Sequence, residues 1–171
     1  MKRLYLLRHA KASRPAKSSD HERPLAARGI WAAESMAEHC AKKLRKVDLV
    51  LCSPAIRAHE TLRLLEQYMP PSCKVVLDES LYLAGGRRLL STLREVGDDF
   101  DVVLVVGHEP GLSDLAAALA EDEGNRRARK RVARGLKTAS LARVDLAVER
   151  WKDLRAGSGR LREVIQPNDL G

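Results

Sequence analysis

Short apolar runs alternate along the chain with segments in which apolar residues recur every three or four positions. The runs are typical of buried strands and lie at 4–7, 48–52, 74–77 and 102–106. The segments between and after them have helical spacing. Their apolar stripes are Ile30, Ala33, Ala37, Cys40, Leu44 and Val47, then Ala58, Leu62, Leu65 and Met69, then Leu89, Leu90, Leu93 and Val96, and finally Leu112, Leu115, Ala116 and Leu119.

Two further strands are predicted near the end of the chain. They lie at 140–148 and 161–165 and are joined by a turn around Gly157-Ser158-Gly159. Strands that alternate with helices favour a parallel sheet covered by helices, and a turn between two strands favours an antiparallel pair. We therefore expect a single α/β domain over residues 1–171, a three-layer α/β/α sandwich with a mainly parallel sheet and antiparallel strands near the C-terminus.

Turn and capping residues indicate where two of the helices begin. Arg28-Gly29 is a turn signal before the first helix, while Ser53 suits the N-cap and Pro54 the first position of the second. Arg57 then falls in the first turn of that helix, beside an N-terminus that attracts anions.

Three of the predicted strands end in residues suited to phosphate chemistry. Arg8 and His9 follow the first strand, Arg57 follows the second, and His108 follows the strand at 102–106. Ligands bind at the carboxyl ends of strands in open α/β sheets, so parallel strands would bring these side chains together. Guanidinium groups hold phosphoryl oxygens, and a neutral imidazole is a nucleophile near pH 7. Three plainer readings stay open: a strand that simply runs into polar residues, a structural salt bridge of either arginine, and a His108 that caps its own loop.

Length and composition fit one intracellular domain. The 171 residues are 44% hydrophobic and only 4% aromatic, so the core must be built mainly from Leu, Val and Ala. Cys40, Cys52 and Cys73 form no close pair, and Cys40 and Cys52 lie at apolar positions, which favours reduced thiols over a disulfide framework. No run approaches a signal sequence or a membrane span. We expect a soluble, cytoplasmic protein that binds no membrane.

The net charge of +8 has a local source between residues 126 and 137. This basic segment contains Arg126, Arg127, Arg129, Lys130, Arg131, Arg134 and Lys137, with acids only at its front, from Glu121. It has no interleaved aromatic residues and no nucleic-acid motif, so a solvated helix face or loop is favoured over a nucleic-acid surface. The excess of positive charge also attracts anionic substrates.

Three motifs, in their order and spacing, resemble branch 1 of the histidine phosphatase superfamily. They are Arg8-His9, Ser53-Pro54-x-x-Arg57-Ala58-x-x-Thr61, and Gly107-His108-x-Pro110. The stretches 6–11, 21–25 and 151–170 are similar to the small SixA-like phosphohistidine phosphatases, which lack the inserted subdomain of larger members. The resemblance implies a phosphoglycerate-mutase-like fold and a phosphatase without metal or cofactor, which passes through a phosphohistidine on the enzyme.

The resemblance also implies roles for individual residues. His9 would be the nucleophile, Arg8 and Arg57 would hold the nonbridging phosphoryl oxygens, and His108 would donate to the same group in the transition state. Ser53 and Arg23 are further candidates for substrate binding. No two histidines have the spacing of a helical metal pair, and none lies near a cysteine at ligand spacing, so we expect no metal site. His39 and His59 are expected on helix surfaces away from the strand ends.

Two positions depart from the wider family. Ala10 replaces the glycine of the Arg-His-Gly motif, and Leu83 stands at the position that matches the general-acid glutamate of larger members. Glu79 and the loop residues Asp20, His21 and Glu22 are the available substitutes, although a solvated loop is the plainer reading of the last two.

The missing acid favours one substrate class. A phosphohistidine loses a neutral imidazole, whereas an alkyl ester must expel an alkoxide, for which acid assistance is worth roughly 10²- to 10⁴-fold. We therefore expect phosphohistidine in a protein substrate. The alternatives are a small acidic phosphomonoester with an acid supplied from a loop and, in a different class, a basic module that binds phosphoprotein or nucleic acid without turnover. Paired imidazoles at the predicted site favour an enzyme over that module.

Overall fold

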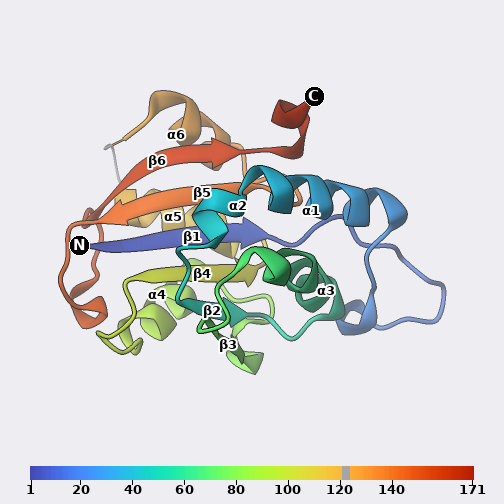
Figure 1. Ribbon diagram of the computed structural model, residues 1–171, viewed down its shortest axis with the longest axis horizontal. Helices are drawn as coiled ribbons and strands as arrows, with labels where there is room; N and C mark the ends of the chain where they lie inside the picture. The colour runs from blue at the N-terminus through green and yellow to red at the C-terminus, as the bar shows by residue number, and fades with distance from the viewer. Residues whose placement is uncertain (121–123) are drawn as a thin grey trace.

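A six-stranded sheet forms the centre of the protein in the computed structural model, which describes residues 1–120 and 124–171 (Figure 1). The strand order is β3-β2-β4-β1-β5-β6. The strands are β1 (Lys2–Arg8), β2 (Leu49–Cys52), β3 (Lys74–Leu77), β4 (Val102–Gly107), β5 (Leu141–Leu146) and β6 (Gly159–Ile165). β1 to β4 pair in parallel, while β5 pairs antiparallel with β1 and β6. The predicted α/β architecture with antiparallel C-terminal strands is confirmed.

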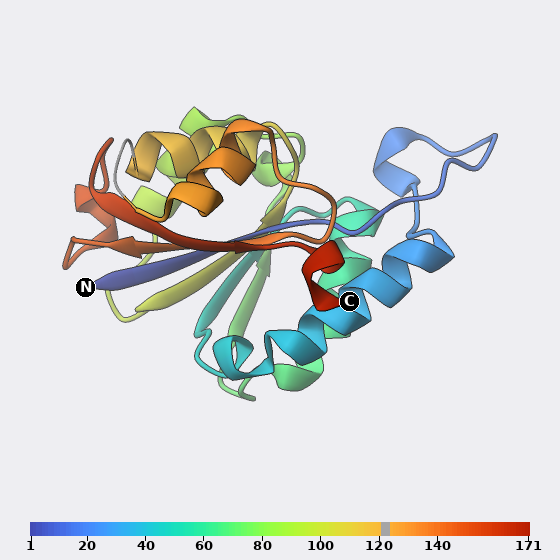
Figure 2. The ribbon, with the colours of Figure 1, turned by 90° about the horizontal axis from the view of Figure 1, so that it is seen from above.

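Helices cover both faces of the sheet (Figure 2). One face carries α1 (Ala27–His39), α2 (Ala41–Leu44) and α3 (Ile56–Leu65), and the other carries α4 (Gly86–Arg94), α5 (Gly111–Ala120) and α6 (Arg126–Ala133). Side chains of β1 alternate between the two cores: Tyr5 and Leu7 pack with the first set, and Leu4 and Leu6 with the second. Burial of each such leucine contributes about 1.5–3 kcal/mol, so the central strand is firmly held.

The strand register positions the site. Arg8 on β1 lies beside Gly107 on β4, and Cys52 on β2 lies beside Val106, which is also on β4. The residues that follow these three strands therefore emerge at one edge of the sheet.

The first helical segment differs from the prediction. A single helix on the stripe from Ile30 to Val47 was expected after an Arg28-Gly29 turn, but α1 begins at Ala27 and the helix breaks at Cys40 before α2. Gly29 lies inside α1 and faces inward, because a Cβ there would stand 2.1 Å from the carbonyl oxygen of Lys11. The buried residues of α1 are Gly29, Ala33, Met36 and Ala37, whereas Ile30 is exposed.

Other element boundaries also move. Ala55, not Ser53, is the N-cap of α3, and Pro54 precedes the helix, because the Ser53 hydroxyl contacts His108. Met69 and Val96 lie beyond the ends of α3 and α4. At the C-terminal hairpin, β5 is shorter than predicted, whereas β6 is longer and includes Gly159.

The basic segment forms a helix over most of its length. It includes α6, in which Ala128 and Val132 are buried, and Arg131 pairs with Asp169 at 2.6 Å. The acids expected at its front, from Glu121 to Glu123, lie outside the described residues.

The three cysteines are free thiols, with Cys40 and Cys52 buried as predicted. Burial raises their pKa values to about 11 for Cys40, 12 for Cys52 and 11 for Cys73, so they stay protonated at neutral pH. Across residues 1–120 and 124–171, no helix has the length and apolarity needed to cross a membrane.

Candidate active site

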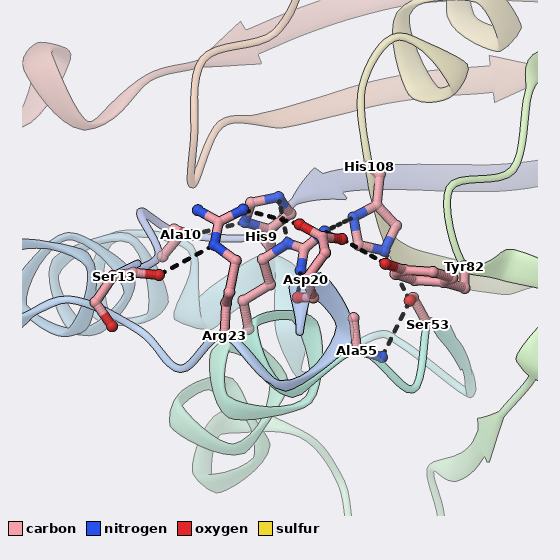
Figure 3. A network of polar contacts seen from close by, with 10 residues as sticks. His9, Ala10, Ser13, Asp20, Arg23, Ser53, Ala55, Tyr82 and His108 are labelled. Carbon is pink, nitrogen blue, oxygen red and sulfur yellow. Dashed lines mark hydrogen bonds and ion pairs between the residues drawn. The ribbon is translucent and has the colours of Figure 1, made fainter. Parts of the chain in front are cut away.

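The sequence-predicted residues His9, Ser53, Arg57 and His108 meet at the carboxyl edge of the sheet and form one chain of polar contacts (Figure 3). All four are buried. His9 follows β1, Ser53 follows β2, Arg57 lies in the first turn of α3, and His108 follows β4. The convergence of His9, Arg57 and His108, expected from parallel strands, is thus found in the structure.

His9 presents an unprotonated nitrogen to the site. Its Nδ1–H donates to the carbonyl oxygen of Ala10 at 2.7 Å, and its Nε2 accepts from Nε of Arg57 at 3.3 Å. Burial, with smaller effects of Arg57 and Arg8, lowers the pKa of His9 to about 4. At neutral pH the imidazole is therefore neutral, with its lone pair on Nε2, which is the form a nucleophile requires.

Backbone contacts hold this imidazole in position. The backbone N–H of His9 donates to Gly107, and that of Ala10 donates to Oγ1 of Thr61 at 3.0 Å. The Thr61 hydroxyl donates in turn to the carbonyl oxygen of Arg57 at 2.7 Å. Thr61, the last residue of the second motif, thereby joins the β1 terminus to α3.

Arg57 connects His9 to the rest of the site. Besides its Nε contact with His9, its Nη2 donates to Oδ2 of Asp20 at 3.0 Å and lies 3.4 Å from Nδ1 of His108. Its Nη1 donates to the Asp20 carbonyl oxygen at 2.7 Å. One guanidinium thus reaches both imidazoles, a geometry suited to a tetrahedral anion seated over His9.

His108 is neutral, and it is a hydrogen-bond donor, as the sequence analysis expected. Burial, followed by the charges of His9 and Arg57, lowers its pKa to about 3. Because Nδ1 faces the Arg57 donor, Nε2 carries the proton and donates to Oγ of Ser53 at 2.7 Å. Ser53 also accepts from the backbone N–H of Ala55 at 3.3 Å, so its own hydroxyl proton is available to a substrate oxygen.

Arg8 lies beside this chain of contacts rather than within it. Its Nη1 donates to the carbonyl oxygen of Leu136 at 2.8 Å, while its buried Nε has no hydrogen-bond partner among the residues that the structure describes. Burial lowers its pKa and the nearby Glu109 raises it. A buried unpaired N–H is costly, and an anion in the site is one group that would satisfy it.

Asp20 and Tyr82 contact the site more extensively than the sequence indicated. The Asp20 carboxylate accepts hydrogen bonds from Arg57, from the Tyr82 hydroxyl and from Nη1 of Arg23 at 3.0 Å. These donors, Tyr82 first, hold the pKa of Asp20 well below its usual range. Tyr82 itself was not identified, and its ring stands edge-on to His108 with centroids 5.6 Å apart. Its position immediately before Leu83 was the only sequence signal.

The remaining loop candidates lie further out. Arg23 reaches the site through Asp20 and donates to the Ser13 carbonyl oxygen at 3.1 Å. Nε2 of His21 lies 4.0 Å from Oε2 of Glu79, whose side chain is 83% exposed. Glu22 is exposed.

Leu83 and the two helical histidines complete the set of predicted positions. Leu83 is 57% exposed, with a positive φ of 51°. His39 is exposed on α1, as expected, whereas His59 on α3 is half-buried rather than a surface residue. Among residues 1–120 and 124–171, no three His, Cys, Asp or Glu side chains are grouped to hold a metal ion.

Comparisons with known proteins agree with this geometry. Residues 4–82 match the model of the histidine phosphatase superfamily, branch 1. An uncharacterized protein of Mycobacterium tuberculosis is 36% identical over 156 residues, which cover 91% of this chain and 96% of that protein. A structure from Nakamurella multipartitia, provisionally assigned as phosphohistidine phosphatase SixA, is 28% identical with a TM-score of 0.79, covering 97% of this chain and 96% of its own.

A third match and a more distant one define how far the likeness extends. The protein histidine phosphatase SixA complexed with tungstate is 25% identical, with a TM-score of 0.76 and 99% of both chains covered. A mycobacterial glucosyl-3-phosphoglycerate phosphatase shares the fold at 17% identity and a TM-score of 0.65, over 94% of this chain and 97% of its own, so the fold alone does not select a substrate. The chain belongs to branch 1 of the histidine phosphatase superfamily and is a SixA-like phosphatase.

Proposed function

We propose that this phosphatase removes the phosphoryl group from phosphohistidine in a protein substrate, with His9 as the nucleophile. The proposal rests on the protonation state of the site. His9 is neutral, Asp20 is ionised, and the hydrogen bond to Asp20 raises the pKa of Tyr82, which makes its hydroxyl a weak acid. Such a site is matched to a leaving group that needs no proton from the enzyme.

In the first step, Nε2 of His9 attacks phosphorus as the bond from phosphorus to the substrate imidazole breaks. The substrate ring, protonated by solvent on its other nitrogen, departs as neutral imidazole. His9 becomes a phosphorylated imidazolium, and its Nδ1–H donates to the Ala10 carbonyl oxygen. Arg57 and the Nε of Arg8 neutralise the phosphoryl oxygens, and the Ser53 hydroxyl donates a hydrogen bond to them. His108 orients that hydroxyl, because its Nε2–H donates to Oγ of Ser53.

In the second step, water attacks the phosphorus of the enzyme intermediate. The P–N bond breaks, its electron pair returns to Nε2 of His9, and the water proton leaves with inorganic phosphate or to solvent. The enzyme returns to its starting state without any change in oxidation state. A metal ion has no role in this sequence, and metal independence stays a prediction that activity in a chelator tests.

The leaving group connects this chemistry to substrate choice. An alkyl phosphate expels an alkoxide unless an acid protonates it, and such assistance is worth roughly 10²- to 10⁴-fold. Leu83 offers no acidic proton at the position that matches the glutamate of larger family members, and the donors around Asp20 keep its carboxyl ionised. Alkyl esters should therefore be poor substrates.

A phosphatase for a small acidic phosphomonoester is the second candidate. The observation in its favour is Tyr82, whose hydroxyl proton lies beside Asp20 and whose ring contacts His108. In that case Tyr82 would protonate the departing oxygen.

Hydrolysis rates on a phosphohistidine peptide and on a series of aryl and alkyl phosphates test the proposal. We expect phosphohistidine to be cleaved fastest and the ester rates to fall steeply as the leaving-group pKa rises, with little change in this slope for Tyr82→Phe. Leu83→Glu should flatten the slope if its carboxyl reaches the leaving oxygen. A flat dependence in the native protein that steepens in Tyr82→Phe would instead favour the phosphomonoester reading.

A further inference from the structure

A groove of about 460 Å³ lies between α1, the segment that follows His9 and the segments that contain Lys137 and Pro167. Its walls include Lys11, Arg28, Trp31, Lys137 and Pro167. We name it the Trp31 groove. Three of its nine lining residues are cations and none is a carboxylate.

The groove is built on the same backbone that holds His9. Lys11 is two residues beyond His9, and its carbonyl oxygen is the group against which Gly29 of α1 packs. On the other wall, the N–H of Ala139, two residues after Lys137, donates to the carbonyl oxygens of Arg8 and His9 at 3.1 Å. Two walls of the groove are therefore continuous with, or hydrogen-bonded to, the backbone of Arg8 and His9.

Trp31 is the unusual feature of this surface. It is 62% exposed on α1, whereas the other tryptophan, Trp151, is fully buried. Tryptophan and arginine are the residues that most often dominate binding energy at protein interfaces. Lys11, Arg28 and Lys137 are exposed and line the groove together with Trp31, so an exposed indole is accompanied by a positive rim.

We propose that the Trp31 groove docks the protein substrate through an acidic segment that carries an apolar side chain. This inference rests on the proposed function and adds the surface that recognises the protein around its phosphohistidine. The positive rim attracts the acidic residues and the indole takes the apolar one. A single exposed aromatic is a poor platform for successive nucleic-acid bases, which favours protein over single-stranded nucleic acid.

Kinetics on two substrates separate docking from chemistry. Trp31→Ala and Arg28→Glu should raise KM about tenfold or more for an acidic histidine-phosphorylated protein, the scale typical of an interface hot spot. The value of kcat for that protein, and kcat/KM for phosphoramidate, should stay within about twofold, because neither residue contacts the reacting atoms. Lys152→Glu is the matched charge reversal: Lys152 is exposed and follows Trp151, whose backbone N–H bonds Asp98 and whose indole N–H bonds Phe100, away from the groove. It should leave both substrates unaffected.

Binding without turnover gives a second measurement. In the His9→Ala protein, the phosphorylated protein should shift the emission of exposed Trp31, and Trp31→Phe should abolish this shift while Trp151 still emits. An unchanged KM for the phosphoprotein in Trp31→Ala would overturn the docking proposal, as would an equal loss on phosphoramidate. Failure of the proposed function is distinguishable, since the native protein would then cleave neither the phosphoprotein nor phosphoramidate.

Discussion

At the scale of single residues, the Arg57 guanidinium is shared between the His9 imidazole and the Asp20 carboxylate. It contacts His9 on one side and Asp20 on the other. A phosphoryl group that enters the site must take over donors that Asp20 now uses, and its negative charge must approach an ionised carboxyl. Arg57 and Asp20 should therefore have opposite effects on anion binding.

Vanadate affinity tests this opposition. Arg57→Ala should weaken vanadate binding, because a charged hydrogen bond is worth roughly 1.5–3 kcal/mol at an ordinary site, or about 10- to 150-fold in Kd. Asp20→Asn should tighten it, because a competing anion is removed. Calorimetric titration of both variants with vanadate shows whether Kd rises or falls in each. Weaker binding in Asp20→Asn would mean that the carboxylate serves chiefly to orient Arg57.

At the scale of elements, the site depends on how closely α1 approaches the β1 terminus. Gly29 permits this approach, since a Cβ there would meet the Lys11 carbonyl oxygen at 2.1 Å. Gly29→Ala should lower the free energy of unfolding by about 1–3 kcal/mol, the usual cost of overpacking, and should reduce turnover by displacing the segment that follows His9. Thermal unfolding and kcat measure the two effects.

Gly85→Ala provides the matched control, because nothing lies within 4 Å of a Cβ at Gly85. This substitution should change the melting temperature and turnover little. If Gly29→Ala and Gly85→Ala have the same melting temperature and both keep native turnover, α1 accommodates a side chain at position 29 despite its close contact with Lys11.

The elements also explain which parts of the site could be predicted. Arg8, His9, Arg57 and His108 were identifiable because apolar runs locate the strands, and parallel register brings their ends together. The Ser53 side chain was misassigned as a cap, since its contact with His108 depends on tertiary structure. Asp20 and Tyr82 meet only because two loops distant in sequence fold over the same edge, and no local pattern encodes that meeting.

At the scale of the whole molecule, two buried neutral histidines make stability depend on pH. Their pKa values are about 4 for His9 and 3 for His108, against 6.5 in an unfolded chain. Below pH 6.5 the unfolded chain binds more protons than the native one. The contribution of these histidines to the free energy of unfolding is therefore complete above pH 6.5 and declines as the pH falls towards their native pKa values.

Urea unfolding at pH 7 and pH 5 measures this linkage. Between these values each histidine should lower the free energy of unfolding by about 2 kcal/mol, less where the two are coupled. His9→Ala should lose correspondingly less stability over the same interval. Equal losses in the native and His9→Ala proteins would show that His9 is already protonated in the folded state at pH 5.

The covalent intermediate on His9 tests the central claim most directly. Rapid quenching of the native protein with a labelled phosphohistidine substrate, followed by peptide mapping at alkaline pH, should find phosphate on Nε2 of His9, because Nδ1 is engaged by the Ala10 carbonyl oxygen. His9→Ala should fold normally and carry no label. Label on Ser53 or on a cysteine, or turnover by His9→Ala, would contradict the account.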